Sequence, residues 1–463
     1  MGDEQQHEVA RSIVDRFTQR TQGSRGADDR AKQVLPGGDT RSATYYPPYP
    51  AYMERGDGCR VYDYDENEYI DFLNNYTSLI HGHGHPGTVS AVREQVARGT
   101  VLGSASHVTL RHAEMLCDRI PSLDAVRYCN SGTEATLMAI RAARAFSEKD
   151  VIVKMDGGYH GAHDSVQVNI QPDLESMGLP QPRRASRGVP ASVLADVLVV
   201  PFNDLVALEH VLQEHAREIA AIILEPVLGS GGGVDPQPGF LQGARALADR
   251  FGVLLIFDEV LTFRLDVGGA QSIYGVTPDL TALGKIIGGG LPVGAFGGRQ
   301  DIMASFDPMH PKTISHSGTF NGNNLTMAAG LATMADYDAG EVARINELGQ
   351  RLKQGINEAF QSAGVVAHAS GMGSLVNIHW QKNEVKTSRE AVAAKMAAKA
   401  VPRLVHLELM NQGIFCASRL QFAISTPMTE REVDQAAQAF QAALSAVRPY
   451  MAEQTPHLVA TSE

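Results

Sequence analysis

The segment 254–259 constrains the fold of this chain more than any other. An uninterrupted apolar run, Leu254-Leu255-Ile256-Phe257, leads directly into the acidic pair Asp258-Glu259. A run without polar alternation is typical of a strand buried on both faces, as in the parallel sheet of an α/β protein. Acidic groups are costly to bury without partners, and ligands bind at the carboxyl ends of such strands. Asp258 is therefore predicted to lie at a ligand site.

A lysine further along the chain complements this carboxylate. Lys285 follows Gly284 and precedes the apolar, glycine-rich segment 286–290, where a lowered amine pKa and a nucleophilic amine are expected. Pyridoxal phosphate requires these two groups, an amine to hold its aldehyde as a Schiff base and a carboxylate to keep its pyridine nitrogen protonated. Alone, Asp-Glu is more often a cap or a metal ligand and Gly-Lys a surface turn. Whether Asp258 and Lys285 form a cofactor site depends on motifs elsewhere in the chain.

Length, charge and cysteine usage narrow the class of protein. A chain of 463 residues exceeds the usual size of one hydrophobic core, so a large and a smaller domain are expected. The net charge of −12 argues against nucleic acid and anionic membranes as partners, and no apolar run is long enough to span a bilayer. The polar amino terminus and four scattered cysteines without a CxxC pair predict a cytoplasmic protein.

Short apolar segments alternate with segments of helical spacing through the middle of the chain. This pattern predicts an α/β fold with a mostly parallel sheet of the seven-stranded type and crossover helices. Most of the predicted strands end in polar residues. The predicted strands are 126–129, 150–154, 197–200, 221–224, 253–257 and 294–297, and the helices include 205–214 and 240–251.

The two ends of the chain are expected to form a smaller α+β domain. We assign 1–75 and 336–463 to this small domain and 76–335 to the large domain that binds the cofactor. The expected elements are an opening helix from about Glu8 to Leu35, a hairpin at 60–72, a long helix at 341–363, a strand at 374–380, a strand-turn-strand segment at 413–424, and a final helix opened by the capping box Thr429-Glu430-Arg431-Glu432.

Three short segments are candidate cofactor contacts. The segment Ser131-Gly132-Thr133 precedes a predicted helix, whose free N–H groups can bind a phosphate, although a hydroxyl there can also be a simple N-cap. Gly318-Thr319 precedes another predicted helix and is a second phosphate candidate. Tyr159, between glycines, can stack on a flat ring, although the same pattern is typical of an ordinary turn.

Histidines and arginines raise two further alternatives. His81, His83 and His85 could share one face of a strand as metal ligands, but the glycines between them indicate a turn, and we expect no metal there. Arg41, in an aromatic loop rich in proline, and Arg419, at a predicted turn, are either solvated side chains or clamps for a carboxylate.

Together these motifs resemble those of the class III aminotransferases, pyridoxal-phosphate enzymes of fold type I. The resemblance covers nearly the whole chain. It implies a homodimer with a shared active site, and transfer of an amino group from a donor to a 2-oxo acid. The six segments that carry it, in the order of the family, are 130–135, 158–161, 224–226, 257–260, 283–285 and 318–320.

The resemblance implies a catalytic role for two residues and a packing role for two others. Lys285 would bind the cofactor covalently and move the proton of the substrate, and Asp258 would pair with the pyridine nitrogen. Val260 would pack on one face of the ring and Tyr159 on the other.

The resemblance also implies a set of phosphate contacts. These come from one subunit at the start of a helix, with a further contact from the second subunit. Ser131, Gly132 and Thr133 would hold the phosphate, Thr319 would come from the second subunit, and His160 and Glu225 would bind near the cofactor without a contact that the sequence defines.

Two subgroups of the family compete for the function. The segments 268–271 and 274–280 are similar to glutamate-1-semialdehyde aminomutases, which predicts an internal shift of the amine. However, the segment 260–265 is one residue shorter than in that subgroup, and 316–321 also departs from it. Aminotransferases of 3-aryl-β-alanines, above all β-phenylalanine, match better, and they also have arginines in the contexts of Arg41 and Arg419.

Two separately placed arginines suit such an enzyme. A β-amino acid and a 2-oxo acid acceptor, 2-oxoglutarate or pyruvate, place their carboxylates differently, and each guanidinium group can hold one of them. Tyr76 and the loop around Tyr45 and Tyr46 would form the wall of an aryl pocket. Another amine or amino-acid transaminase, a racemase or decarboxylase with the same cofactor, and a non-catalytic relative remain open, although the intact Lys285 argues against the last.

Overall fold

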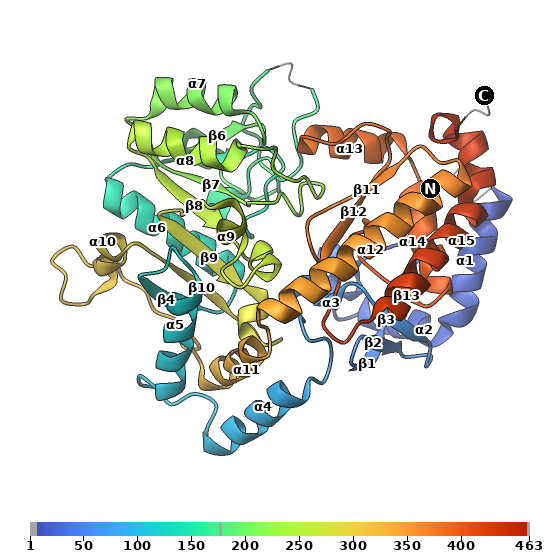
Figure 1. The fold of residues 1–463 in the computed structure, drawn as a ribbon, viewed down its shortest axis with the longest axis horizontal. Coiled ribbons are helices and arrows are strands. Elements are labelled where there is room, and N and C mark those ends of the chain that lie inside the picture. The colour runs from blue at the N-terminus through green and yellow to red at the C-terminus, as the bar shows by residue number, and fades with distance from the viewer. Residues whose placement is uncertain (1–6, 176–177, 461–463) are drawn as a thin grey trace. The chain divides into compact units, whose positions relative to one another are not determined.

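The computed structural model describes residues 7–175 and 178–460, which form two compact units. The larger unit comprises Pro86–Ala343 and Val385–Val392. The smaller unit is built from the described parts of Met1–His85, Arg344–Glu384 and Ala393–Glu463. Figure 1 labels the helices and strands of both units.

A seven-stranded sheet lies at the centre of the larger unit. Its spatial order is β4-β10-β9-β8-β7-β5-β6, and β10 runs antiparallel to both of its neighbours, whereas the other neighbouring pairs are parallel. The predicted α/β fold with a mostly parallel sheet is confirmed. The strands are β4 (Ala125–Cys129), β5 (Val151–Met155), β6 (Val197–Val200), β7 (Ile219–Leu224), β8 (Leu254–Asp258), β9 (Leu280–Gly284) and β10 (Gly294–Gly298).

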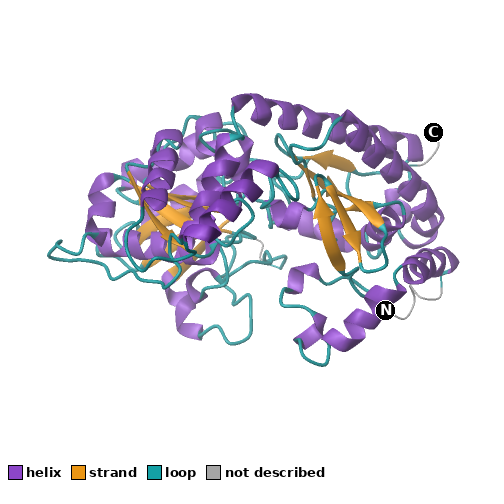
Figure 2. Cartoon of the chain, turned by 90° about the horizontal axis from the view of Figure 1, so that it is seen from below, coloured by secondary structure: helices purple, strands orange, loops and turns teal. Residues whose placement is uncertain are grey.

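Helices surround this sheet, and Figure 2 shows them on both sides of its strands. The described residues of the segment 164–194 contain short 3-10 turns and an isolated β-bridge between Val168 and Arg184. The helices of the larger unit are α4 (Pro86–Arg98), α5 (His107–Arg119), α6 (Gly132–Ser147), α7 (Leu205–His215), α8 (Phe240–Phe251), α9 (Ala270–Tyr274), α10 (Gln300–Met303) and α11 (Asn324–Ala335).

Successive residues of the central strands belong to different hydrophobic clusters. Ile223 and Ile256 pack in the cluster that contains α6, whereas Ile222 and Leu255 pack in the cluster that contains α7 and α8. Because successive side chains of a strand point to opposite faces, α6 covers one face of the sheet, and α7 and α8 cover the other. Coverage of both faces explains why these strands are almost entirely apolar.

The smaller unit contains two small sheets, ordered β1-β2-β3-β13 and β11-β12-β14. The predicted hairpin is confirmed, since β2 and β3 pair in antiparallel fashion. β13 pairs in parallel with β3, which joins segments far apart in the sequence. The strands are β1 (Met53–Asp57), β2 (Arg60–Asp63), β3 (Glu68–Asp71), β11 (His368–Ser370), β12 (Leu375–His379), β13 (Ile414–Phe415) and β14 (Phe422–Ala423).

The opening of the chain forms two helices, so the prediction of a single helix from Glu8 to Leu35 was wrong. The break is at Thr21, whose backbone is not helical (φ −124°, ψ 40°) and whose hydroxyl donates to the Phe17 carbonyl at 2.6 Å. The helices outside the larger sheet are α1 (Glu8–Arg20), α2 (Gln22–Ala31), α3 (Asn74–Thr77), α12 (Ala339–Ala363), α13 (Ser388–Ala397), α14 (Val401–Asn411) and α15 (Glu430–Gln454).

The predicted capping box of α15 is confirmed. The Thr429 hydroxyl accepts from the Arg431 N–H, and Glu432 accepts from the Thr429 N–H at 3.0 Å. Among residues 7–175 and 178–460, no helix combines the length and the apolar character needed to cross a membrane.

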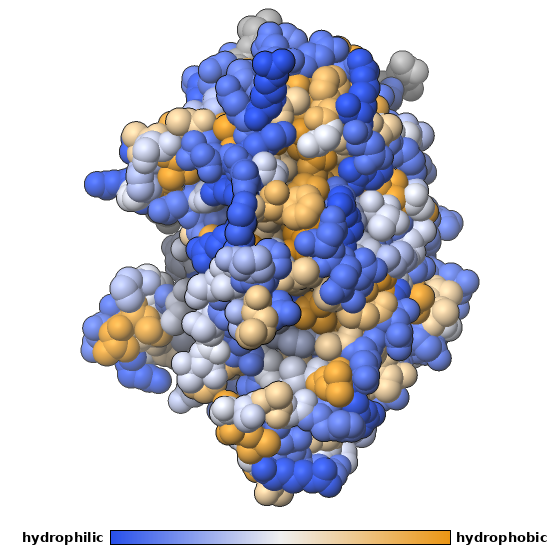
Figure 3. Space-filling view, turned by 90° about the vertical axis from the view of Figure 1, so that its left-hand side faces the viewer, coloured by the Kyte–Doolittle hydropathy of each residue, from blue (hydrophilic) through white to orange (hydrophobic). Residues whose placement is uncertain are grey.

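Hydrophilic side chains cover most of the face that Figure 3 shows, and apolar side chains gather toward its middle. In the larger unit, two large apolar side chains are strongly exposed in the segment between α10 and α11. Met309 is 89% exposed and Phe320 is 59% exposed. This segment also carries Gly318-Thr319, so a candidate phosphate contact lies beside uncovered apolar surface.

Candidate active site

Five loops of the larger unit meet at one edge of its sheet. Because β4 and β9 are each antiparallel to β10, they are parallel to one another, and their carboxyl ends lie on the same edge as those of β5, β7 and β8. The structure thus brings together nine of the ten predicted cofactor residues: Ser131, Gly132, Thr133, Tyr159, His160, Glu225, Asp258, Val260 and Lys285.

Asp258 and His160 form a buried hydrogen-bonded pair at this edge. His160 Nδ1 lies 2.9 Å from Asp258 Oδ2, and the Val260 N–H donates to Oδ1 of the same carboxylate at 3.1 Å. Burial is the main influence on the imidazole and lowers the pKa of His160. The neutral ring donates to a carboxylate that only accepts, so Asp258 has a fixed orientation and a negative charge available to a cationic group.

Glu225 lies beside this pair, and its carboxyl group is buried. Its Oε1 accepts from the Tyr159 N–H at 3.0 Å, and its Oε2 accepts from the Gly229 N–H at 3.1 Å. Burial, and then the charge of Asp258, raise the pKa of Glu225 to about 8. A protonated carboxyl group can donate a hydrogen bond to a ligand, which the ionised form cannot do.

Lys285 directly follows β9 and has a strained backbone. Its φ of 50° lies in the left-handed region, which is uncommon for a residue with a side chain. A Cβ on the preceding Gly284 would lie 3.3 Å from Val260 Cγ1, so the lysine strand and the Asp258 loop approach closely. Strain of this kind persists where the surrounding structure enforces it, often at functional sites.

The start of α6 forms an anion cradle. Ser131 is the N-cap, and its Oγ accepts from the Glu134 N–H at 3.2 Å, so the N-cap alternative is confirmed. Thr133 Oγ1 accepts from the Ala162 N–H at 3.2 Å, and a Cβ on Gly161 would lie only 2.6 Å from Thr133 Cα. The two loops therefore touch, and the N–H groups of the first helical turn remain suited to a phosphate.

This set of groups fits pyridoxal 5′-phosphate. Asp258 would offer a buried carboxylate to the pyridine nitrogen, Lys285 an amine to the aldehyde, and the start of α6 N–H donors to the phosphate. Tyr159 is 42% exposed and Val260 is half-buried, so both can cover a flat ring. Thr319, the tenth predicted contact, is exposed on the loop before α11.

The three predicted substrate residues lie together in the smaller unit. Arg41 Cζ is 5.7 Å and Arg419 Cζ is 5.9 Å from the centre of the Tyr76 ring. The Tyr76 hydroxyl donates to the Ala43 carbonyl, and Arg41 Nη1 donates to Asn75 Oδ1 at 2.8 Å. Burial raises the pKa of Tyr76, which keeps its hydroxyl neutral. Two cations therefore share one aromatic ring.

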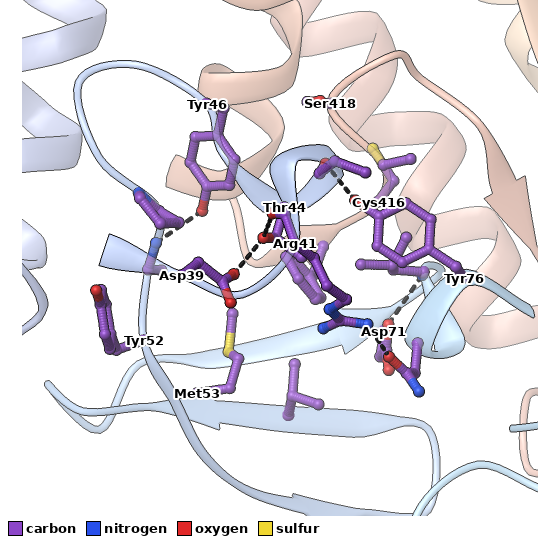
Figure 4. A pocket seen from close by; sticks show the side chains of 18 of the residues that line it. Asp39, Arg41, Thr44, Tyr46, Tyr52, Met53, Asp71, Tyr76, Cys416 and Ser418 are labelled. Atoms are coloured by element: carbon purple, nitrogen blue, oxygen red, sulfur yellow. Dashed lines mark hydrogen bonds between the residues drawn. The ribbon is translucent and has the colours of Figure 1, made fainter. Parts of the chain in front are cut away.

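Arg41 and Tyr76 also line a cavity of about 390 Å³ in the smaller unit, shown in Figure 4. Tyr46, which the sequence placed in an aryl wall, is buried there, and its hydroxyl accepts from the Ala51 N–H at 2.8 Å. Tyr45 is 48% exposed and does not line the cavity. Further apolar and aromatic lining comes from Tyr52, Met53, Val61 and Phe415.

Tyr76 lies within a left-handed turn that the sequence did not reveal. Its four residues, Asn74–Thr77, have φ values of 49°, 47°, 55° and 73°, and none is a glycine. Left-handed backbone costs about 1–2 kcal/mol for each such residue. The Asn-Asn pair, since asparagine tolerates this conformation best, was the available signal.

The histidine tract contacts separate partners. His83 Nε2 lies 2.7 Å from Asp71 Oδ2, whereas His81 Nδ1 lies 2.7 Å from Thr426 Oγ1 and its ring stacks on His85. The tract therefore contacts a carboxylate and a hydroxyl that come from two different segments of the smaller unit.

Comparison with known proteins identifies the family. The sequence profile of the family Aminotransferase class-III matches residues 42–444. The chain belongs to the class III aminotransferases. A glutamate-1-semialdehyde 2,1-aminomutase of Methanothrix thermoacetophila is 42% identical over 371 residues, which cover 80% of this chain and 85% of that protein.

Solved structures of this family share the fold. An omega-transaminase from Sphaerobacter thermophilus is 43% identical, with a TM-score of 0.89 over 92% of this chain and 98% of its own. A beta-phenylalanine aminotransferase from Variovorax paradoxus is 33% identical, with a TM-score of 0.86 over 98% of this chain and all of its own. The predicted family and fold type are confirmed, and with them pyridoxal 5′-phosphate as the cofactor of this class of enzyme.

One residue near the site of this aminotransferase was missed from the sequence. Lys154 is fully buried in β5, and its Nζ donates to the carbonyls of Val168 at 2.6 Å, Gly158 at 3.0 Å and Met155 at 3.4 Å. It thereby ties the loop that carries Tyr159 and His160 to the sheet. A lysine within an apolar strand was the signal, because such a group is rarely buried without partners.

Proposed function

We propose that this class III aminotransferase moves the amino group of a β-amino acid, a 3-aryl-β-alanine such as β-phenylalanine, to 2-oxoglutarate or pyruvate by a ping-pong mechanism. The observation that carries the proposal is the placement of two guanidinium groups, Arg41 and Arg419, within 6 Å of the Tyr76 ring. The relative from Variovorax paradoxus, a beta-phenylalanine aminotransferase that this chain matches along its full length, supports the same substrate class.

The sheet edge of the larger unit is the proposed site of chemistry. Bound pyridoxal 5′-phosphate would withdraw electrons from the bond that breaks at the substrate carbon. The Lys285 amine would move the proton from the donor carbon to the cofactor, and in the second half of the ping-pong cycle from the cofactor to the acceptor carbon. The charge of Asp258, oriented by His160, would favour a protonated pyridine nitrogen, and the start of α6 would hold the phosphate.

The arginine cluster is the proposed site for carboxylates. An arginine binds a carboxylate through two parallel hydrogen bonds, which fixes the orientation of the substrate. The donor and the acceptor differ in the distance between carboxylate and reacting carbon, so one arginine would serve each. The neighbouring cavity, with Tyr46, Tyr76 and Phe415 in its wall, would take the aryl group.

A homodimer with a shared active site is part of this proposal. Thr319 would reach the phosphate of the partner subunit from its exposed loop. The exposure of Met309 and Phe320 in the same segment supports the idea, because large apolar side chains of this kind are usually covered at an interface. Light scattering on the purified protein, with a Phe320→Asp variant as the disrupted form, would test it.

A second function is supported by the sequence comparisons. The aminomutases of Methanothrix thermoacetophila and Ignicoccus hospitalis are each 42% identical to this chain. An aminomutase moves an amine within one molecule and needs no separate acceptor.

Absorbance of the purified holoenzyme separates the two functions. For the aminotransferase, the yellow band of the bound cofactor should bleach with β-phenylalanine and return only when 2-oxoglutarate or pyruvate is added. Return of the band without an acceptor, or a product that is an isomer of the substrate, would favour the aminomutase. No change with any β-amino acid would reject the proposed donor class.

A further inference from the structure

The left-handed turn Asn74–Thr77 is held by bonds that converge on Asp71. Asp71 is buried at the end of β3, and its Oδ1 accepts from the N–H groups of Leu73 and Asn74, each at 2.8 Å. Its Oδ2 lies 2.7 Å from His83 Nε2, which donates because a carboxylate only accepts. The carboxylate thus fixes the two peptide groups that lead into the turn, and His83 fixes the carboxylate.

Asn74 secures the turn from the other side. It is fully buried, and its Nδ2 donates to the Ala423 carbonyl in β14 at 2.8 Å. Left-handed backbone without glycine persists only where the surroundings enforce it. Bonds from β3, from the histidine tract and from β14 supply that enforcement.

The turn determines where the arginine cluster lies. Its second residue, Asn75, accepts from Arg41, and its third, Tyr76, places a ring near both arginines. Figure 4 shows Asp71, Arg41 and Tyr76 around the same cavity. With right-handed backbone, the side chains of Asn75 and Tyr76 would leave this position.

Asp71 also leaves Arg41 available to a substrate. Both are in the wall of the cavity, and an unengaged Asp71 would compete with a substrate carboxylate for the guanidinium group. Three N–H donors bind its two oxygens instead, so the Asp71 carboxylate stabilises the turn and does not compete for Arg41.

We propose that Asp71 and His83 are positioning residues for carboxylate recognition, acting through the left-handed turn on Arg41 and Tyr76. The inference rests on the proposed function of the arginine cluster. It gives part of the histidine tract a role that needs no metal.

Steady-state kinetics of the holoenzyme tests the proposal with two amino donors, β-phenylalanine and the carboxylate-free 1-phenylethylamine. Asp71→Ala should raise the KM for β-phenylalanine about tenfold or more while changing kcat/KM for the amine by less than about threefold. Asp71→Asn keeps an oxygen for the turn, and His83 can accept from its amide in the other tautomer. This conservative variant should stay within about threefold of the wild type for both donors.

Asp63 provides a matched control from the same small sheet. It is equally buried, and its carboxylate accepts from the N–H groups of Asp65 and Asn67 and from the Tyr69 hydroxyl, but it holds a different turn. If Asp71 were only structural, Asp63→Ala and Asp71→Ala would change the two donors alike. That result would overturn the proposal.

A double-mutant cycle distinguishes a failure of this inference from a failure of the proposed function on which it rests. If Asp71 acts through Arg41, then Asp71→Ala should add less than about twofold to the KM of an Arg41→Ala enzyme. A selective effect of Arg41→Ala with none from Asp71→Ala would refute the positioning role alone. No selective effect of Arg41→Ala on β-phenylalanine, 2-oxoglutarate or pyruvate, relative to the carboxylate-free amine, would refute the proposed substrate site.

His83→Ala keeps the test decisive should Asp71→Ala fail to fold. This variant retains both bonds from Asp71 Oδ1 to the turn and loses only the bond that orients the carboxylate. It should raise the KM for β-phenylalanine by about three- to tenfold and spare the amine. An equal effect on both donors, or none on either, would overturn the proposal.

Discussion

His160 Nδ1 and Asp258 Oδ2 lie 2.9 Å apart, in a pair whose members are both buried at the carboxyl edge of the larger sheet. The pair connects two loops that follow different strands, β5 and β8. A neutral imidazole that donates to a carboxylate orients it without cancelling its charge. Asp258 can therefore present a full negative charge in a direction fixed by the fold.

Replacing either member of this pair should lower turnover by different amounts. Asp258→Asn removes the charge that favours a protonated cofactor ring, and kcat/KM should fall by at least about 100-fold. His160→Leu removes only the orienting hydrogen bond to that charge, so a loss of about tenfold is expected. Single-turnover rates with saturating cofactor measure both. Equal losses would show that His160 does more than orient Asp258.

Lys285→Ala should abolish turnover without abolishing cofactor binding. The variant removes the amine that moves the substrate proton, whereas the start of α6 and Asp258 remain to hold phosphate and ring. We expect kcat to fall by more than about 1,000-fold while a dialysed sample still retains cofactor. Lys312→Ala is the control, since that side chain is 81% exposed. Appreciable activity in the Lys285→Ala enzyme would contradict its assigned role.

Glu225→Gln should change how stability depends on pH. In the unfolded chain Glu225 loses its proton near its ordinary pKa of 4.5, whereas in the folded protein it keeps the proton to about pH 8. Between these values the folded state binds more protons, so the free energy of unfolding falls as pH rises. Glutamine cannot ionise, so the free energy of unfolding of the variant does not fall for this reason as pH rises.

Melting temperatures of the wild type and of Glu225→Gln measure this effect. Glutamine offers one acceptor fewer to the N–H groups of Tyr159 and Gly229, which lowers the stability of the variant by an amount that does not depend on pH. Comparing the difference in melting temperature at several pH values removes this constant contribution. The melting temperature of the variant, relative to the wild type, should rise by a few degrees between about pH 5 and pH 8. A difference that is flat across this range would mean that Glu225 is ionised in the folded protein.

The sequence predicted the larger unit better than the smaller one. Strand β7 is apolar throughout, and β8 is apolar up to its last residue, Asp258, because both of their faces are covered, and this pattern can be read locally. β9 was not predicted as a strand, because Leu-Thr-Ala-Leu-Gly is short and contains weak strand formers. The pairing of β13 with β3 depends on contacts between distant segments, which no local pattern records.

The candidate site shows the same division. Lys285 and Asp258 were found because pyridoxal phosphate requires an amine and a carboxylate together, and because other motifs along the chain agree with that cofactor. The left-handed turn at Asn74–Thr77 was missed, since its conformation is imposed by Asp71 and by β14 rather than by its own residues. The buried contacts of Lys154 required the structure for the same reason, because its acceptors are backbone carbonyls.

Arg41→Ala and Arg419→Ala should each weaken the binding of one class of carboxylate. A charge-assisted hydrogen bond contributes about 1.5–3 kcal/mol, so the KM of the substrate that uses the missing arginine should rise about 10- to 100-fold. Simple amines without a carboxylate should be spared. Steady-state kinetics with β-phenylalanine, 2-oxoglutarate, pyruvate and 1-phenylethylamine would assign each arginine. A similar loss for all four would contradict the carboxylate clamp.

Lys154→Met should destabilise the larger unit and slow turnover as a consequence. Burial lowers the pKa of Lys154 to about 8, yet at neutral pH most of the amine is still charged, and it donates to three backbone carbonyls. Methionine fills a similar volume but leaves these carbonyls unpaired in the interior. Replacing a buried ion by an apolar side chain leaves stability unchanged only when its hydrogen-bond partners are replaced as well. Backbone carbonyls cannot be replaced by a side-chain substitution.

The expected loss is about 2–4 kcal/mol, because a buried acceptor left unpaired costs about 1–3 kcal/mol. The melting temperature should fall by roughly 3 to 8 °C. Hydrogen exchange should also speed up in the loop that carries Tyr159 and His160, since Lys154 holds the Gly158 carbonyl next to it. Lys312→Met, which removes an exposed lysine paired with Glu148, should shift the melting temperature by less than about 1 °C. Unchanged exchange in the loop of Lys154→Met would show that other contacts, such as the bond from the Tyr159 N–H to Glu225, are sufficient to hold it.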